Sequence, residues 1–382
     1  MIQISRRRRN QQVLIDLGTA NILMAAVEYT QTDIPHILGI YRRHRLPSVR
    51  SNVRDFQSRL MHELKDLFTA LQKELPDFSP TEIHYGLTAP YYTAETVKVR
   101  QAFDATHIIT ADDMENIKAR GVDTFLEHFK HPSAVAVFEV RPLEQFLNGY
   151  PTNNIVGRSG TELALTMRYA AAHQMLIHGF QDLSLRFHTE VRTVLHTFPQ
   201  LYADMFKENI LDHGVQVIVD IGGELSEIVI LEGGIIQNVY TLPVGVLDLT
   251  EEIARLYRID FESGEVIWRK YIANRLEPGE EGKIDEILRT IVINWKPHFE
   301  MAFREMPSGS KRSLNIFLVG GGALLADVQA LIMSLEIMTK MIIPPQMHQM
   351  DPKAFQDKVN GYEHFEGAGD FGILSLLLRK PL

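Results

Sequence analysis

The sequence contains no cysteine in its 382 residues. This absence excludes disulfide scaffolds, thiolate zinc sites, iron–sulfur clusters and cysteine nucleophiles together, and it fits a reducing compartment. No stretch approaches the roughly 20 apolar residues that span a bilayer. The sequence also lacks the G-x-x-x-x-G-K-[ST] loop that cradles phosphates and the H-E-x-x-H pattern of zinc proteases. The sequence therefore gives no indication of a P-loop nucleotide hydrolase or of a zinc protease with this motif.

A surplus of basic residues is missing as well. Lysine and arginine total 39 against 48 acidic residues, which gives a net charge of −9. A non-specific nucleic-acid binder needs a basic face to neutralise phosphates, so we expect no nucleic-acid partner. Apolar residues make up 45% and charged residues 23%, as in ordinary globular proteins. At roughly 100–200 residues per domain, the length predicts two or three domains.

Positive charge is concentrated near the N-terminus, in the run Arg6–Arg9. A secretory signal would continue with 7–15 apolar residues, whereas Val13-Leu14-Ile15 is followed at once by Asp16. The run predicts weak contact with anionic lipid, at roughly 1 kcal/mol per charge; the alternative is a solvated basic tail over residues 1–12. We therefore expect a cytoplasmic protein, peripheral to the inner face of the cell membrane.

Hydrophobic patterning predicts strands alternating with helices, which is typical of the α/β class. Val13–Val27 has the pattern of a β-hairpin. Phe56–Leu75 carries apolar residues at spacings of three and four, which predicts a helix. Asp248 and Glu251 form a capping-box pattern that predicts a helix start. A further helix is expected from Ile284 until Pro297 ends it.

The arrangement strand–Asp–x–Gly–strand occurs twice, at Asp16 and again at Asp220. A glycine beside an aspartate at a hairpin tip lets backbone N–H groups turn towards an anion, while the carboxylate can hold a metal ion or water. Two such hairpins facing each other can clamp the phosphates of one nucleotide. A third turn, Gly320–Gly322, follows a buried strand and leaves room for a flat base against the backbone.

Taken in this order, these features resemble the actin/Hsp70/sugar-kinase superfamily, and within it the FtsA branch with its PilM relatives. The phosphate-1, phosphate-2 and adenosine loops would be Ile15–Asn21, Val219–Glu227 and Leu318–Leu325. Glu139–Pro142 followed by Ile155–Leu163 resembles part of the inserted 1C subdomain, of SHS2 type. Actin and Hsp70 lack this insertion, so it separates the FtsA branch from the wider superfamily.

The resemblance implies a two-lobed actin-like, ribonuclease H-like α/β fold with 1C and 2B insertions. After a basic tail at 1–12, the expected subdomains are 1A at 13–104 and 183–213, 1C at 105–182, 2A at 214–247 and 313–382, and 2B at 248–312.

The resemblance also implies that ATP or ADP binds with Mg²⁺ between the two halves. The implied nucleotide-binding residues are Asp16, Gly18, Thr19, Asp220, Gly222, Gly223, Ser226, Glu265, Gly320, Gly321 and Gly322. Asp16 and Asp220 would hold the Mg²⁺ ion and its waters. Glu190 would be the catalytic residue that orients water near the γ-phosphate; the alternative is an ordinary glutamate on a helix surface.

This sequence departs from the family pattern in several places. The phosphate-2 loop has Glu224 where relatives have a glycine, at the closest approach of the main chain to the phosphates. Leu225 replaces a threonine and removes its hydroxyl. Trp268 stands where relatives have a lysine beside the adenine, and the amphipathic membrane helix that usually ends FtsA proteins has no counterpart. We expect nucleotide binding with absent or very slow hydrolysis; a nucleotide-free scaffold is the alternative.

Three functions from different classes follow. The first is an FtsA-like cytoskeletal adaptor that forms protofilaments and links a tubulin-like division-ring protein, bound through subdomain 2B, to the membrane. The second is a PilM-like cytoplasmic scaffold of a type IV pilus or secretion apparatus. The third is a sugar-kinase-type phosphotransferase, which needs a general base beside its substrate hydroxyl.

Replacing all four residues of Arg6–Arg9 with glutamine is expected to remove most binding to anionic vesicles. Four exposed charges at about 1 kcal/mol each give weak attachment, which salt screens. Vesicle flotation at low and high salt measures this. Tight binding that survives high salt, or binding that the four substitutions leave unchanged, contradicts the prediction.

Overall fold

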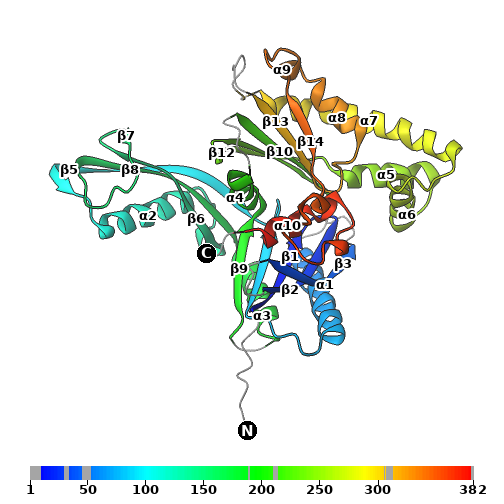
Figure 1. The fold of residues 1–382 in the computed structure, drawn as a ribbon, viewed down its shortest axis with the longest axis horizontal. Helices are drawn as coiled ribbons and strands as arrows, with labels where there is room; N and C mark the ends of the chain where they lie inside the picture. The colour runs from blue at the N-terminus through cyan, green and yellow to red at the C-terminus, as the bar shows by residue number, and fades with distance from the viewer. Residues whose placement is uncertain are drawn as a thin grey trace, which may run out of the picture. The chain divides into compact units, whose positions relative to one another are not determined.

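The computed structural model describes residues 10–29, 34–44, 53–187, 190–209, 214–304, 306 and 313–379. The chain divides into two compact units (Figure 1). The larger unit comprises Met1–Thr88, Ser184–Val194 and Phe198–Leu382, and the smaller unit comprises Ala89–Leu183 and Leu195–Thr197.

A first five-stranded sheet has the order β3 (Pro35–His44), β2 (Asn21–Tyr29), β1 (Asn10–Leu17), β4 (Glu82–Leu87) and β9 (Arg192–Thr197). It belongs to the larger unit except for the last three residues of β9. β1 and β2 pair antiparallel, with Val13 opposite Ala26, and β1 runs parallel to β4. The predicted hairpin is therefore confirmed. Helix α1 (Val53–Glu74) packs against β2 and β3 through the predicted apolar stripe, so this helix is confirmed too.

A second sheet repeats this order with β12 (Ile235–Leu242), β11 (Ser226–Glu232), β10 (Val215–Ile221), β13 (Leu314–Val319) and β14 (Gln346–Gln349). Its first strand again pairs antiparallel with the next strand in sequence and parallel with the fourth. The larger unit is thus two lobes built on one strand order. The Asp-x-Gly pattern occurs twice in the sequence because each lobe has one such turn after its first strand.

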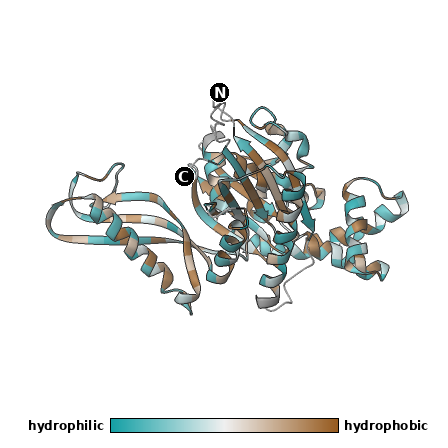
Figure 2. Cartoon of the chain, turned by 90° about the horizontal axis from the view of Figure 1, so that it is seen from below, coloured by the Kyte–Doolittle hydropathy of each residue, from teal (hydrophilic) through white to brown (hydrophobic). Residues whose placement is uncertain are grey.

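The two lobes share a hydrophobic core. Helices α4 (Phe198–Asn209) and α10 (Phe371–Leu377) contribute buried residues to it, together with strands from both sheets. Leu14 of the first sheet and Ile218 of the second are both fully buried in this cluster. Hydrophobic residues accordingly concentrate on the strands of the larger unit (Figure 2).

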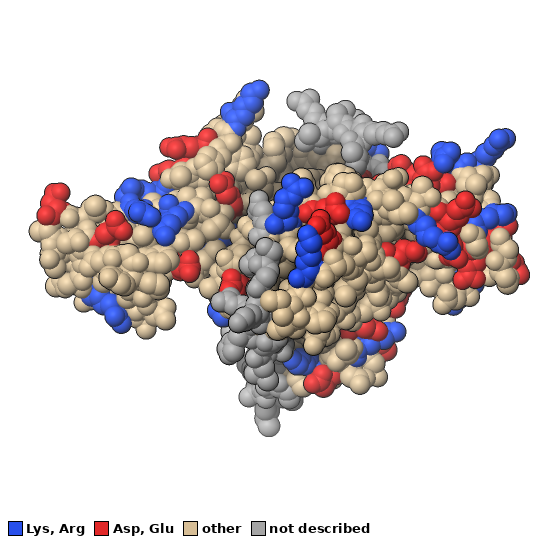
Figure 3. Space-filling model, turned by 90° about the horizontal axis from the view of Figure 1, so that it is seen from above, with Lys and Arg blue, Asp and Glu red and all other residues tan. Residues whose placement is uncertain are grey.

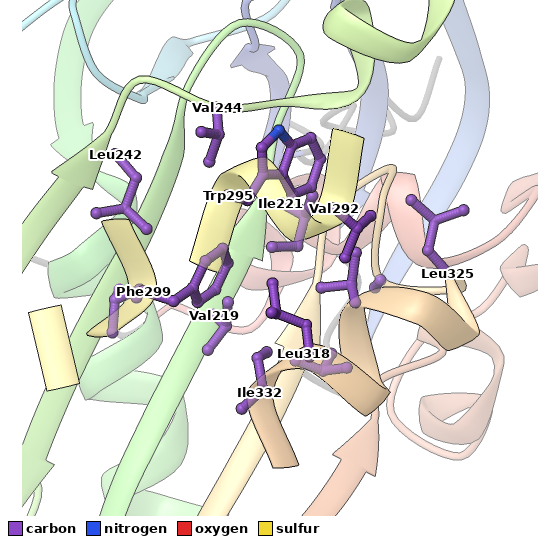
Figure 4. Close-up of a cluster of buried hydrophobic side chains, with 14 of the residues drawn as sticks. Val219, Ile221, Leu242, Val244, Val292, Trp295, Phe299, Leu318, Leu325 and Ile332 are labelled. Carbon is purple, nitrogen blue, oxygen red and sulfur yellow. The ribbon is translucent and has the colours of Figure 1, made fainter. Parts of the chain in front are cut away.

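The second lobe carries helices α5 (Val246–Tyr257), α6 (Phe261–Ile272), α7 (Pro278–Phe303), α8 (Ala326–Met333) and α9 (Glu336–Thr339). α7 and α8 cover the second sheet, and Figure 4 shows Trp295 and Phe299 of α7 turned towards Val219 and Leu318 of the strands. Short 3₁₀ turns complete the chain at Pro132–Ala134, Pro352–Phe355, Tyr362–His364 and Ala368–Asp370.

Two predicted helix boundaries in this lobe are wrong. α7 continues through Pro297, because Trp295 and Phe299 on either side of it are buried and hold the helix on the sheet. Proline leaves the carbonyl of Ile293 without its helical donor, and that residue is exposed, so water can satisfy the group. α5 begins at Val246 rather than after Asp248.

Asp248 lies within the first turn of α5 and caps it from inside. Its carboxylate accepts hydrogen bonds from the backbone N–H of Gly245 at 3.3 Å and from Trp295 Nε1–H at 3.2 Å. The residue therefore does satisfy a donor at the helix start, but from the third helical position. The capping-box pattern therefore located the first turn of α5 correctly but placed the start of the helix too late.

The smaller unit is a four-stranded antiparallel sheet with one helix on it. The strand order is β5 (Thr93–Ile108), β8 (Ser159–His173), β6 (Val135–Leu147) and β7 (Tyr150–Pro151). Helix α2 (Ala111–Leu126) packs on this sheet, and α3 (Gln174–Ser184) follows β8. β5 crosses residue 105, where the inserted subdomain was expected to begin, and the compact unit starts at Ala89. The division into subdomains 1A, 1C, 2A and 2B stays a prediction.

The structure bears on surface charge and on membrane contact only for the residues that it describes. The predicted lipid contact, Arg6–Arg9, lies outside the described residues. Among the helices that the structure describes, none is both long enough and apolar enough to cross a bilayer. On the face drawn in Figure 3, acidic and basic side chains are interspersed.

Replacing Gly121 with alanine is expected to lower the free energy of unfolding by about 1–3 kcal/mol through overpacking. A Cβ at this position of α2 would lie 1.9 Å from the hydroxyl oxygen of Tyr169. Gly282 in α7 is the matched control, because a Cβ there meets nothing within 4 Å. Gly282→Ala should stabilise the protein by about 0.5–1 kcal/mol through helix propensity. Urea unfolding of both variants gives the answer, and stabilisation by both would contradict the packing argument.

Candidate functional site

A cleft lies where the hairpin turns of the two lobes meet. It is lined by residues from the β1–β2 turn, the β10–β11 turn, the ends of β4 and β13, helix α4 and the start of α10: Asp16, Gly18, Thr19, Ala20, Asn21, Leu23, Thr88, Phe198, Tyr202, Asp220, Gly222, Gly223, Val246, Gly320, Gly321, Gly369 and Gly372. The structure therefore brings together eight of the eleven residues that the sequence singled out for nucleotide binding: Asp16, Gly18, Thr19, Asp220, Gly222, Gly223, Gly320 and Gly321.

The other three predicted nucleotide-binding residues do not line this cleft, and neither does the predicted catalytic residue Glu190. Ser226 is fully buried and donates its hydroxyl to the carbonyl of Val244 at 2.8 Å. Gly322 packs on a neighbouring side chain, where a Cβ would lie 2.2 Å from a methyl group. Glu265 on α6 pairs with Arg269 at 2.6 Å.

Glu190, the predicted catalytic residue, lies on an exposed turn before β9. It was expected on a helix that approaches the γ-phosphate, and the described backbone there is not helical. The role assigned to it by resemblance has no support from its position. A surface residue, the alternative reading, fits its exposure.

The two acidic residues of the cleft explain the glycines opposite them. A Cβ at Gly372 would lie 2.1 Å from Asp16 Oδ2, and a Cβ at Gly320 would lie 2.3 Å from Asp220 Oδ1. Gly320 also has a φ of +85°, a region that disfavours other residues. Each carboxylate thus lies directly against a backbone Cα, which only glycine permits.

Both carboxylates of the cleft have raised pKa values. Burial raises the pKa of Asp16 well above its ordinary range, and the charges of Asp220 and Asp370 raise it further. Burial also raises the pKa of Asp220 to about 6; a hydrogen bond from the Tyr202 hydroxyl, 2.7 Å from Asp220 Oδ2, opposes this rise, whereas Glu227 adds to it. Two partly desolvated carboxylates in one cleft destabilise each other unless a proton or a cation compensates them.

This donor set fits Mg²⁺. Hard carboxylate oxygens suit the ion, which in nucleotide sites commonly takes one or two carboxylates together with phosphate oxygens. The described residues contain no cluster of three or more His, Asp or Glu that could hold a metal by itself. Asp16 and Asp220 are therefore enough for an ion that also binds phosphate, and too few for a cage made only of protein.

Two features of the site were not found from the sequence. Tyr202 belongs to α4, where it follows Phe198 by four residues and has the pattern of a core position. Arg42 on β3 donates to Asp370 at 2.8 Å and to the carbonyl of His364 at 3.0 Å, and so fixes the segment that forms the far wall of the cleft. This pair joins residues 328 positions apart, for which no local pattern exists.

The two hairpin turns are bonded to each other. The backbone N–H of Glu224 donates to Thr19 Oγ1 at 2.9 Å. The start of α5 is also satisfied internally, because Val246 N–H donates to the carbonyl of Gly222 and Leu247 N–H to that of Gly223, each at 3.0 Å. The side chain of Glu224 is buried and is not among the residues that line the cleft. The residue is therefore neither exposed to solvent nor part of the cleft lining.

Comparison with known proteins defines the class first. No family model matches the chain, and no curated protein matches it either. The duplicated sheets and the cleft between them are those of a two-lobed actin-like α/β fold, so the predicted fold class is confirmed.

Among solved structures, the chain is similar to one described as a PilM–PilN type IV pilus biogenesis complex, with a TM-score of 0.68 and 18% identity over 97% of this chain and 99% of that one. At this identity the similarity establishes the fold alone. The ethanolamine utilization protein EutJ from Carboxydothermus hydrogenoformans (TM-score 0.47, 14% identity, 89% and 84% covered) and an actin-like protein of unknown function from Bacteroides thetaiotaomicron VPI-5482 (0.46, 10%, 100% of both) are too distant to carry an argument. The FtsA-specific branch is not confirmed.

Replacing Asp220 with asparagine is expected to stabilise the protein at pH 8. Because the folded state holds a proton on Asp220 more tightly than the unfolded chain does, the free energy of unfolding falls as pH rises from about 4 to about 6, and the loss persists above that range. The rise from 3.8 to about 6 corresponds to at most about 3 kcal/mol. Urea unfolding at pH 3.5 and pH 8 should show the gain only at the higher pH. The exposed Asp104→Asn variant is the control; equal gains at both pH values would contradict the argument.

Proposed function

We propose that the chain is a PilM-like cytoplasmic adaptor of a type IV pilus or related secretion apparatus. The observation that carries this proposal is the extent of the similarity, which runs over 97% of this chain and 99% of the PilM chain at a TM-score of 0.68. A PilN-like protein is the partner proposed for it, and a membrane attachment of that partner would anchor the adaptor at the inner face of the membrane.

An FtsA-like division role is the alternative. In this role the chain would form protofilaments, bind a tubulin-like partner through residues 248–312 and contact lipid through Arg6–Arg9. The support for it is that the segments around Glu139 and Gly157 resemble FtsA. In the structure, both Glu139 carboxylate oxygens accept hydrogen bonds from Thr197, one from its N–H at 3.2 Å and one from its hydroxyl at 3.0 Å. This residue therefore has a structural role within the smaller unit and gives the division role no particular support.

The cleft supports weak binding of ATP or ADP with Mg²⁺ as part of the same proposal. Asp16 and Asp220 would hold the ion, and the glycines at positions 222 and 223 would let the backbone approach phosphate. Bound Mg²⁺ would neutralise charge on both the carboxylates and the phosphates. Turnover is proposed to be slow or absent, because Glu190 lies on an exposed turn and Leu225 supplies no hydroxyl.

Co-expression of the tagged chain with the PilN-like protein and the tubulin-like division protein of the same genome tests the proposal. We expect the PilN-like protein to co-purify and the division protein not to. Purification with and without ATP and Mg²⁺ shows whether the nucleotide matters, and release of phosphate from ATP is expected to stay near background. Retention of the division protein alone, or rapid turnover of ATP, would overturn the corresponding part of the proposal.

A further inference from the structure

Three contacts join the two lobes of the larger unit, and two of them start from Thr19 and Thr88, which line the cleft. Thr19 accepts the backbone N–H of Glu224 at 2.9 Å, Thr88 donates to Glu227 at 3.0 Å, and His44 Nδ1 lies 3.5 Å from Glu265 Oε1. In each contact a threonine or histidine of the first lobe meets a glutamate of the second. The protein therefore supplies its own bonds at the place where a ligand would otherwise connect the lobes.

The Thr19 contact occupies the position most important for phosphate. Glu224 lies at the tip of the β10–β11 turn, and its N–H is the kind of main-chain donor that cradles a phosphate oxygen. Here that donor is already bonded to the hydroxyl of Thr19, a buried residue. A phosphate oxygen can take the donor only after the Thr19 bond breaks.

The two turns also approach each other closely at Gly223. A Cβ on Gly223 would lie 2.5 Å from the backbone nitrogen of Ala20, so even a methyl group does not fit. A phosphate between these tips requires the turns to separate. The hydrogen bond between Thr19 and Glu224 opposes that separation.

We propose that Thr19 is a built-in competitor for phosphate and the residue that sets nucleotide affinity in this cleft. This inference rests on the proposed nucleotide site and gives Thr19 the opposite role from the one that resemblance implies: its hydroxyl holds the phosphate-2 turn closed instead of binding the ligand. The lobes are then closed by the protein's own bonds, and an adaptor of this kind keeps its closed form without ATP.

Thr19→Val tests the proposal by removing the hydroxyl at nearly constant volume. The Glu224 N–H then loses the Thr19 acceptor that competes with phosphate, so binding of ADP and ATP with Mg²⁺ should tighten about two- to tenfold, the range set by one net hydrogen bond. Thr19→Ser keeps the hydroxyl and should bind as the unmodified protein does. Thr69→Val removes a hydroxyl that bonds only within helix α1 and is the matched control. Isothermal titration calorimetry measures all four proteins, and weaker binding by Thr19→Val overturns the proposal.

Hydrogen exchange at the Glu224 amide gives a readout that needs no nucleotide. The amide should be protected in the unmodified protein and in Thr19→Ser and Thr69→Val, and should exchange at least tenfold faster in Thr19→Val. If no protein binds nucleotide, the nucleotide part of the proposed function fails, and the exchange data alone decide on the Thr19 bond. Unchanged exchange in a folded Thr19→Val variant overturns the inference whatever the calorimetry shows.

Discussion

The burial of two carboxylates, Asp16 and Asp220, in one cleft is the constraint on which the architecture of the site depends. Each lies one residue before the end of the first strand of a five-stranded sheet, and the duplicated strand order brings them into one cleft. Burial raises the pKa of both; the charges of Asp220 and Asp370 raise that of Asp16 further, and the charge of Glu227 raises that of Asp220. The surrounding residues accommodate the two carboxylates. Gly320 and Gly372 let the backbone lie against them, and the Tyr202 hydroxyl donates a hydrogen bond to Asp220.

The stability that permits this unfavourable pair comes from elsewhere in the unit. α4 and α10 share a buried cluster with both sheets, and α7 presses Trp295 and Phe299 onto the second sheet. Burial of large apolar side chains contributes roughly 1.5–3 kcal/mol each. Arg42 compensates the nearby Asp370 with a bond of 2.8 Å. A large hydrophobic framework therefore offsets the cost of burying these carboxylates, which is typical of a site kept for binding at some expense in stability.

The same constraint connects the site to the proposed role. Contacts made by Thr19, Thr88 and His44 join the two lobes of the larger unit, and the bond from Glu224 N–H to Thr19 uses a main-chain donor of the phosphate-2 turn. In the proposed function, both properties would serve an adaptor that presents a fixed surface to a partner protein.

The sequence by itself determined the hairpins at both Asp-x-Gly turns and the helix α1, because these follow from periodicity and turn chemistry within a few residues. Eight of the residues that line the cleft were implied by the resemblance of these turns to a known family. Only the tertiary structure decided that α7 continues through Pro297, that Glu265, Ser226, Gly322 and Glu190 lie outside the cleft, and that Arg42 meets Asp370. It also decided that Thr19 bonds to the opposite turn. These outcomes depend on residues hundreds of positions apart, whose burial and donors become defined only when the two lobes pack together.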